Sequence, residues 1–343
     1  MKSGILKIIG VNLVVFSLLF LCVFSVLLRP LDSPIIIESE NLNFVNISTE
    51  KKEETQEITS SKSETANEQK EEAVETSAEA IKGKIITQYN SPYLAKDSYN
   101  KVYLKNNTSL DISIKKYLEG QINFKVQKNA DPKVLILHTH ATETFKTDDK
   151  DYFTESFSSR SQDNTKNMVS VGKIVAEKLN SAGIVTLHDT TLHDYPSYSK
   201  SYSRSAETVN SYLKKYPSIK VVLDLHRDAV TKENGDKVKL QTEINGKKAA
   251  QVMLVQGSQS GAVTNFPKWE ENFKLAVKLQ QTIEKNYPTL ARPLMLMSKN
   301  YNQSLTTGSL LIEFGTDVNT LEEVHYSAEM VGDCLAELLT SLQ

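Results

Sequence analysis

"VLILHTHATETF", residues 134–145, joins an apolar run to two histidines that stand one residue apart. The apolar run 134–137 predicts a buried strand. Because residues i and i+2 of a strand point to the same side, we expect His138 and His140 to face one space. Strand ends are where α/β proteins place their ligand sites, so the stretch is compatible with a metal site. Two structural histidines with satisfied hydrogen bonds are the alternative interpretation of the same residues.

Strand and helix patterns alternate through the rest of the C-terminal half. Apolar runs that predict strands occupy residues 133–138, 184–188, 219–226 and 309–314, and patterns with helical spacing occupy residues 164–183, 204–217, 266–288 and 319–342. Residues 239–257 predict two strands joined by a hairpin turn at Asn245-Gly246. This alternation predicts an α/β fold with a mostly parallel central sheet flanked by helices.

Two further predicted strands carry groups that could bind a metal or move a proton. His226 ends the strand 219–226, and Glu313 lies in the strand 309–314. The carboxyl ends of parallel strands meet at one edge of a sheet, so we expect His140, His226 and Glu313 to share a site. Two histidines and a carboxylate hold Zn²⁺ with one position open for water. Glu313 would then take the proton of the attacking water and give it to the leaving amine.

The third metal ligand stays open between two carboxylates. Glu143 stands three residues after His140, and Asp163 stands just before the first predicted helix. Asp163 is also a natural helix-capping residue, which is its ordinary structural role. His138 could bind the metal directly, or it could orient a metal ligand through a hydrogen bond.

The composition of the whole chain limits the class of protein. A length of 343 residues allows one or two domains, and a net charge of −2 gives no electrostatic case for binding nucleic acid. Cys22 and Cys334 are the two cysteines, which is too few for a disulfide framework. A metal site must therefore use histidines and carboxylates, as catalytic zinc sites do.

The N-terminal part of the chain predicts a membrane anchor. Residues 8–28 carry no charge, and the run is long enough to cross a bilayer core of about 30 Å. No small-residue cleavage site follows the run, so we expect one uncleaved helix within residues 1–29. Lys2 and Lys7 favour a cytoplasmic N-terminus, which places the rest of the chain outside that membrane.

The composition changes twice between the anchor and the α/β part. Residues 30–85 are rich in mixed charges, Ser and Thr. They predict a disordered linker, because they offer little apolar surface to offset the entropy of folding. Residues 86–130 regain aromatic and β-branched residues and predict a small strand-rich segment. Residues 131–343 would then form the catalytic domain.

Five motifs together resemble the stage II sporulation protein P family. They are HTHATETF, DNTKNMVSVG, HDTTLHDYPSYSKSYSRS, DLHRDA and LLIEFGTDVNTLEEV, and the likeness extends from about Val102 to the C-terminus. The predicted anchor and linker also fit the layout of that family. The family in turn resembles zinc-dependent N-acetylmuramoyl-L-alanine amidases, so the resemblance implies an amidase-like catalytic domain and a zinc cofactor.

The amidase pattern implies roles for single residues. Its first zinc histidine corresponds to His140, and its second corresponds to His226. Its glutamate ligand, which precedes the first helix, falls on Asp163, a shorter side chain, so Glu143 stays a candidate ligand. Its catalytic glutamate corresponds to Glu313 in the run EFGTDVN.

The resemblance also implies a reaction and a setting. It implies a peptidoglycan hydrolase of engulfment that cleaves the N-acetylmuramoyl–L-alanine amide bond of stem peptides, with endopeptidase action on peptide cross-links. It implies work alongside the sporulation proteins D and M, between the mother-cell and forespore membranes. A peptidoglycan-binding module without catalysis is one alternative, and another metallohydrolase of the same polymer, such as a deacetylase, is a second.

Substrate-binding residues are expected near the same strand ends. Tyr198 and Arg204 lie in the loop after a predicted strand, and Arg204 could hold a peptide carboxylate through two hydrogen bonds. Arg227 is a further candidate for substrate binding, and together with Asp228 it could orient groups around His226. Ordinary polar residues of a surface loop would give the same pattern.

Overall fold

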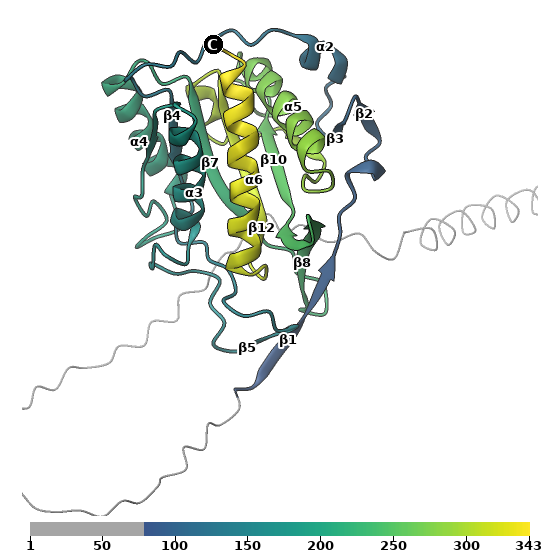
Figure 1. The fold of residues 1–343 in the computed structure, drawn as a ribbon. Coiled ribbons are helices and arrows are strands. Elements are labelled where there is room, and N and C mark those ends of the chain that lie inside the picture. Colours follow the sequence, from purple (N-terminus) through teal and green to yellow (C-terminus); the bar gives the residue numbers. More distant parts are fainter. Residues whose placement is uncertain (1–78) are drawn as a thin grey trace, which may run out of the picture. The chain divides into compact units, whose positions relative to one another are not determined.

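The computed structural model describes residues 79–343 (Figure 1). The predicted membrane helix and most of the predicted linker lie outside these residues. Within the described range, no helix combines the length and the apolar character that crossing a bilayer requires. The described chain contains an eight-stranded main sheet and a smaller four-stranded sheet.

The main sheet is mostly parallel, as predicted. Its strands lie in the order β2-β3-β11-β10-β12-β7-β4-β6. These strands are β2 (Asp97–Tyr99), β3 (Val102–Asn107), β4 (Val134–Leu137), β6 (Thr186–His188), β7 (Val221–Asp228), β10 (Val252–Gly257), β11 (Leu294–Met297) and β12 (Ser309–Thr316). The pairs β2–β3 and β10–β12 are antiparallel, and the other neighbouring pairs in this described sheet are parallel.

Helices pack on both faces of the main sheet. The long helices of the described range are α3 (Met168–Ser181), α4 (Ser201–Lys215), α5 (Trp269–Asn286) and α6 (Leu321–Thr340), and the short helix α2 (Ile114–Glu119) packs beside α5. Figure 1 shows α3, α6 and α5 side by side across one face. Val134 and Ile136 of β4 belong to the large core on that face, whereas Leu135 and Leu137 pack with Val209 of α4. Side chains along β4 therefore alternate between two different cores.

The predicted strands and helices of residues 131–343 are all present, with shifted ends. The final helix, α6, begins after Thr320, which forms a reciprocal capping box with Glu323. The strand β11 was not predicted, since a run of four residues gives little periodicity to read.

The smaller sheet has the order β5-β1-β8-β9. Its strands are β1 (Ile81–Gln88), β5 (Tyr152–Thr154), β8 (Lys237–Ile244) and β9 (Lys247–Ala250). The linker predicted over residues 30–85 is wrong in its last residues, because β1 already begins at Ile81. Ile85 is buried with Phe153 and Val318, so this end of the segment does have apolar surface to bury. The segment 86–130 is likewise part of the fold and supplies β2, β3 and α2.

The predicted hairpin lies in the smaller sheet and leads into β10, a strand of the main sheet that is antiparallel to β12. β8 and β9 pair antiparallel, and the turn residues Asn245 and Gly246 have φ angles of 52° and 75°. Positive φ at both positions is typical of a two-residue hairpin turn and confirms the prediction. The chain then passes directly from β9 into β10, which joins the main sheet antiparallel to β12.

Candidate active site

Three neighbouring parallel strands carry or precede the predicted catalytic and metal-binding residues. β12, β7 and β4 are adjacent in the main sheet, and Glu313 is the register partner of His226. His140 follows the end of β4, and its ring centroid lies 5.2 Å from that of His226, with the two rings nearly perpendicular. The structure therefore brings His140, His226 and Glu313 together across three strands.

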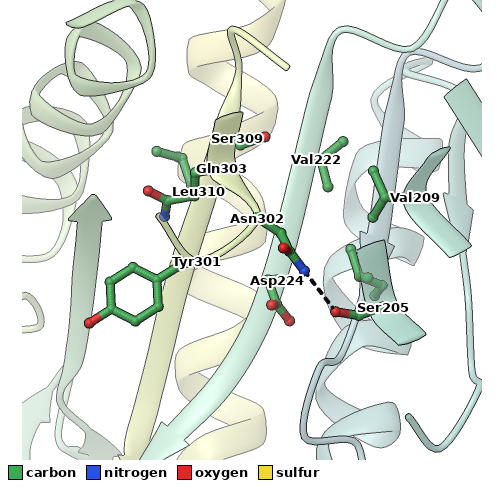
Figure 2. A pocket seen from close by; sticks show the side chains of 10 residues that line it. Ser205, Val209, Val222, Asp224, Tyr301, Asn302, Gln303, Ser309 and Leu310 are labelled. Atoms are coloured by element: carbon green, nitrogen blue, oxygen red, sulfur yellow. Dashed lines mark hydrogen bonds between the residues drawn. The ribbon is translucent and has the colours of Figure 1, made fainter. Parts of the chain in front are cut away.

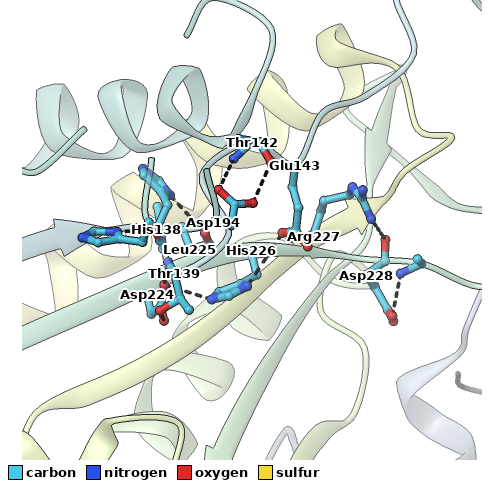
Figure 3. Close-up of polar contacts among 12 residues, drawn as sticks. His138, Thr139, Thr142, Glu143, Asp194, Asp224, Leu225, His226, Arg227 and Asp228 are labelled. Carbon is cyan, nitrogen blue, oxygen red and sulfur yellow. Dashed lines mark hydrogen bonds and ion pairs between the residues drawn. The ribbon is translucent and has the colours of Figure 1, made fainter. Parts of the chain in front are cut away.

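His226 lies between two carboxylates (Figure 3). Its Nε2 atom is 2.9 Å from Asp224 Oδ1, and its Nδ1 atom is 3.7 Å from Glu143 Oε2. The same Glu143 oxygen accepts a hydrogen bond from the main-chain N–H of Arg227. Burial alone would lower the pKa of His226, but the Asp224 carboxylate raises it to about 10. Asp224 thus holds the imidazole in one orientation, with Nδ1 toward Glu143.

The carboxylate of Glu313 is poorly matched to its surroundings. Its Oε2 atom is buried and has no hydrogen-bond partner among residues 79–343. Burial raises the pKa of Glu313 to about 8; the charge of His226 opposes this shift, and the carboxylate of Asp228 adds to it. A carboxyl group with a pKa near neutrality can both accept and release a proton, as general acid–base catalysis requires.

Asp228 belongs to a buried ion pair. Its Oδ2 atom lies 2.8 Å from Nη1 of Arg292, and its Oδ1 atom accepts a hydrogen bond from the N–H of Ala229. These partners are not groups around His226, so the predicted role of Asp228 in orienting such groups stays a prediction. Its effect on the site is electrostatic, because its charge raises the pKa of Glu313.

One ring nitrogen of His140 has no hydrogen-bond partner within the described range. Its ring stacks on Tyr198 with centroids 4.4 Å apart and an angle of 14° between the planes. Its Nδ1 atom is buried without a hydrogen-bond partner there. Burial, together with the positive charge of His226, lowers the pKa of His140 to about 2. The imidazole is therefore neutral, which is the form that binds metals.

His138 points into a different environment, so the prediction that the two histidines face one space is wrong. Its Nδ1 lies 3.0 Å from the carbonyl oxygen of Leu225, and its Nε2 lies 2.9 Å from Nε2 of His188. A Cβ atom at Gly172 of α3 would lie 2.5 to 2.6 Å from both Nε2 atoms. Because β4 ends at Leu137, strand alternation no longer governs the turn that carries His138 and His140. His138 supports the site indirectly, through the carbonyl group that precedes His226.

The two candidate carboxylate ligands differ in burial and in partners. Glu143 is 6% exposed and lies beside His226. The Asp163 side chain is 42% exposed, and its carboxylate accepts hydrogen bonds from Thr165 and pairs with Lys166. Asp163 therefore stabilises the turn before α3, and Glu143 is the carboxylate inside the site.

Two arginines predicted to bind substrate are used by the fold. The donors of Arg204 reach the carbonyl groups of His193, Ser197 and Ser199, and those of Arg227 reach the carbonyl groups of Thr144, Ser159 and Asp228. Irregular loops leave carbonyl groups without strand partners, and a guanidinium group satisfies several of them at once. These contacts hold loops in place, and substrate binding by Arg204 and Arg227 stays a prediction.

Two residues of the site, Arg160 and Asp224, were not among the predicted ones. The guanidinium carbon of Arg160 lies 4.8 Å from the ring centroid of Tyr198, and its Nη2 lies 4.0 Å from Glu143 Oε1. No sequence pattern marks Arg160, since it lies in an irregular polar loop. Asp224 does carry a signal, because a carboxylate inside an apolar strand needs a partner.

A small cavity lies behind Asp224 (Figure 2). Its volume is about 10 Å³, which is room for about one water molecule. Its lining residues are Leu137, Ser205, Val209, Val222, Asp224, Tyr301, Asn302, Gln303, Ser309 and Leu310. Beside it, Asn302 donates to Ser205 Oγ, and Thr139 donates to Asp224 through both its N–H and its hydroxyl group. The cavity is too small for a sugar or peptide and belongs to the support of Asp224.

The side chains of His140, Glu143 and His226 bear on whether the site can hold a metal ion. Among residues 79–343, no three His, Cys, Asp or Glu side chains already converge as a metal site. The donor types nevertheless fit zinc, because imidazole and carboxylate groups are ligands that it accepts. His140 Nδ1 lacks a partner in this range, and Glu143 Oε2 already lies 3.7 Å from His226 Nδ1. His140, Glu143 and His226 are the residues that could hold the ion, and His226 would release its proton on binding it.

Comparison with protein families and curated proteins gives one consistent match. The family described as Stage II sporulation protein P matches residues 28–336. Stage II sporulation protein P of Bacillus subtilis (strain 168) is 31% identical over 224 residues, which cover 62% of this chain and 52% of the relative. The matched region thus spans about half the length of that curated relative.

Several solved amidase structures are similar to this chain. The CwlD amidase from Clostridioides difficile, solved in complex with the GerS lipoprotein, is 10% identical with a TM-score of 0.39, covering 62% of this chain and 100% of that one. The N-acetylmuramoyl-L-alanine amidase AmiC2 of Nostoc punctiforme is 14% identical with a TM-score of 0.36, covering 61% and 96%. The N-acetylmuramoyl-L-alanine amidase from Clostridium difficile 630 is 18% identical with a TM-score of 0.35, covering 62% and 95%.

Proposed function

Because this chain belongs to the stage II sporulation protein P family, we propose that it hydrolyses peptidoglycan during the engulfment stage of sporulation. The bond is the amide between N-acetylmuramic acid and L-alanine of the stem peptide, and peptide cross-links are a second target. The observation that carries this proposal is Glu313, a buried carboxyl group in register with His226 whose Oε2 atom has no hydrogen-bond partner among residues 79–343.

Zinc is the proposed cofactor, held by His140, Glu143 and His226. When bound, it would polarise the scissile carbonyl group and lower the pKa of water. Asp224 keeps Nε2 of His226 engaged, so that Nδ1 is the nitrogen available on the side of Glu143. Asp163, the position that family resemblance suggested as a ligand, is assigned to the turn before α3 instead.

Glu313 is the proposed general base and acid. Its buried Oε2 atom takes a proton from the attacking water as the carbonyl carbon becomes tetrahedral. It then gives that proton to the nitrogen of L-alanine as the carbon–nitrogen bond breaks. Burial raises the pKa of Glu313 above that of an ordinary glutamate, so the carboxyl group holds the transferred proton more firmly until the second step.

Anchoring and partners are part of the same proposal. One helix within residues 8–28 crosses the membrane, with the N-terminus in the cytoplasm and the catalytic domain between the mother-cell and forespore membranes. The uncharged run and the lysines before it support this orientation. The sporulation proteins D and M are the proposed partners, on the basis of the family alone.

Digestion of purified peptidoglycan by the full-length protein in detergent tests the proposal, with products measured by mass spectrometry. We expect free stem peptides from the wild-type protein, and their loss both with a chelator and with Glu313→Gln. Glu313→Gln should keep its zinc, because Glu313 is not a proposed ligand. Undigested wall with protein bound to it would replace the amidase by a binding module, and released acetate would replace it by a deacetylase.

A further inference from the structure

Arg160 differs from Arg204 and Arg227, whose donors bind main-chain carbonyl groups. Arg204 and Arg227 each direct their donors to three main-chain carbonyl groups. Arg160 donates hydrogen bonds through Nη1, to Thr142 Oγ1 and Asp194 Oδ2, while its Nη2 forms a long ion pair with Glu143 at 4.0 Å, and its side chain is 38% exposed. Among residues 79–343, neither Nε nor Nη2 of Arg160 donates a hydrogen bond.

The position of Arg160 is fixed from two sides. Its guanidinium group lies over the ring of Tyr198, which itself stacks on His140. Its Nη1 is held by Asp194, whose side chain is fully buried and also accepts from the N–H and the hydroxyl of Thr142 (Figure 3). A buried carboxylate that pairs with an exposed arginine fixes the plane of the guanidinium group and leaves its other edge to an incoming ligand.

The unused edge faces the proposed catalytic centre. Nη2 lies 4.0 Å from Glu143 Oε1, too far for a hydrogen bond but close enough to mark its direction. Arg160 therefore lies where it could meet an anionic group of a ligand that approaches His140 and Glu143.

From this geometry we infer that Arg160 binds a carboxylate on the peptide side of the substrate, an inference that rests on the proposed function. In a muramoyl peptide, the lactyl carboxyl group is consumed in the scissile amide, so free carboxylates lie only on the peptide. The residue after L-alanine is D-glutamate, which carries a free α-carboxylate or its amide. A guanidinium edge with two N–H groups matches a carboxylate in shape and charge.

Two N-acetylmuramoyl tripeptides test this inference, one with a free α-carboxyl group at the second residue and one with the amide there. For the full-length wild-type protein, we expect kcat/KM to be about 10- to 100-fold higher for the acid, mainly through KM, as for a hydrogen bond to a charged group. Arg160→Lys keeps a charge for Asp194 but loses the two-pronged edge, so the ratio should fall toward one. Arg160→Gln should remove the preference entirely.

Lys166→Gln is the matched control, because it removes one positive charge from the same loop while Lys166 pairs with Asp163. Its ratio should equal that of the wild type. Equal treatment of acid and amide by the wild type, or an unchanged ratio in Arg160→Lys, would overturn the inference. If neither tripeptide is cleaved, the proposed function fails. The affinities of the wild type and Arg160→Lys for the two tripeptides then decide the role of Arg160 on their own.

Discussion

His138 and His140 stand one residue apart, yet they occupy two different kinds of site. Both ring nitrogens of His138 have partners, Leu225 and His188, and α3 closes over them at Gly172. His140 keeps a buried Nδ1 with no partner in the described range, against the ring of Tyr198. A satisfied buried polar group stabilises a fold, whereas an unsatisfied one costs free energy and marks a site that awaits a ligand. His138 therefore supports the fold, whereas His140 offers a nitrogen to a ligand.

Replacing each histidine by alanine is the strongest way to break this comparison. His140→Ala should lower zinc affinity by more than about 100-fold, beyond the 10- to 100-fold effect of residues that only orient a ligand. Its free energy of unfolding should fall less than that of His138→Ala, because the variant loses packing against Tyr198 but no hydrogen bond from Nδ1. Native mass spectrometry with zinc titration and denaturant unfolding measure the two quantities. A His138→Ala protein with the greater zinc defect would reverse the assignment.

The two carboxylates make the same contrast outside the histidine pair. Glu143→Gln should lower zinc affinity by more than about 100-fold, whereas Asp163→Asn should leave it unchanged. The physical reason is that Glu143 is buried beside His226, while Asp163 is engaged with Thr165 at the surface. Zinc titration of both variants measures this, and a loss of affinity in Asp163→Asn would restore the family pattern.

Gly172→Ala tests how tightly α3 packs on His138 and His188. The added methyl group would lie 2.5 to 2.6 Å from Nε2 of His188 and of His138, so α3 must shift. Overpacking of this kind lowers the free energy of unfolding by about 1–3 kcal/mol. Urea unfolding measures the loss, and Lys173→Ala on the exposed side of α3 is the control, with an expected change of about 0.5 kcal/mol or less. Wild-type stability in Gly172→Ala would show that the histidine pair is not tightly packed.

The smallest expected effect is a dependence of stability on pH. Burial lowers the pKa of His188 from 6.5 to about 4, so the unfolded chain binds more protons than the folded one between these values. The free energy of unfolding should therefore fall as pH drops below 6.5, by about 1 kcal/mol from this residue at pH 5.5. Urea unfolding at several pH values measures the slope. His188→Asn should reduce the slope without removing it, because the pKa values of His138 and His140 are also lowered, to about 3 and about 2. An unchanged slope would assign the proton uptake to other groups.

The sequence predicted the sheet and the neighbours of the site better than the details of each side chain. Apolar runs located β4, β7 and β12, and the rule that strand ends meet brought His140, His226 and Glu313 together. These predictions depend on periodicity and topology, which follow from the order of apolar and polar residues along the chain. The antiparallel entry of β10 was not predicted, because a hairpin turn does not say which sheet its second strand joins.

The errors concern side chains in irregular segments, or side chains whose partners lie there. The alternation rule failed at His138 because the strand had already ended at Leu137. Arg204 and Arg227 have the right charge and neighbourhood for substrate binding, but only the loop backbone decides which carbonyl groups claim their donors. The role of Arg160 could not be predicted from the sequence, because only the fold brings Tyr198 and Asp194 beside it.

The strand β1 gives the molecule a mechanical property. Its first residues pair antiparallel with β5, and its last residues pair with β8 in parallel. A pulling force applied to Ile81 along the strand would load both sets of hydrogen bonds in shear, because the ladder bonds lie across the direction of force. β8 in turn packs against β12, the strand that carries Glu313. Tension on the N-terminal side of the domain would thus be shared between two neighbouring strands, one of which contacts the strand of the proposed catalytic acid.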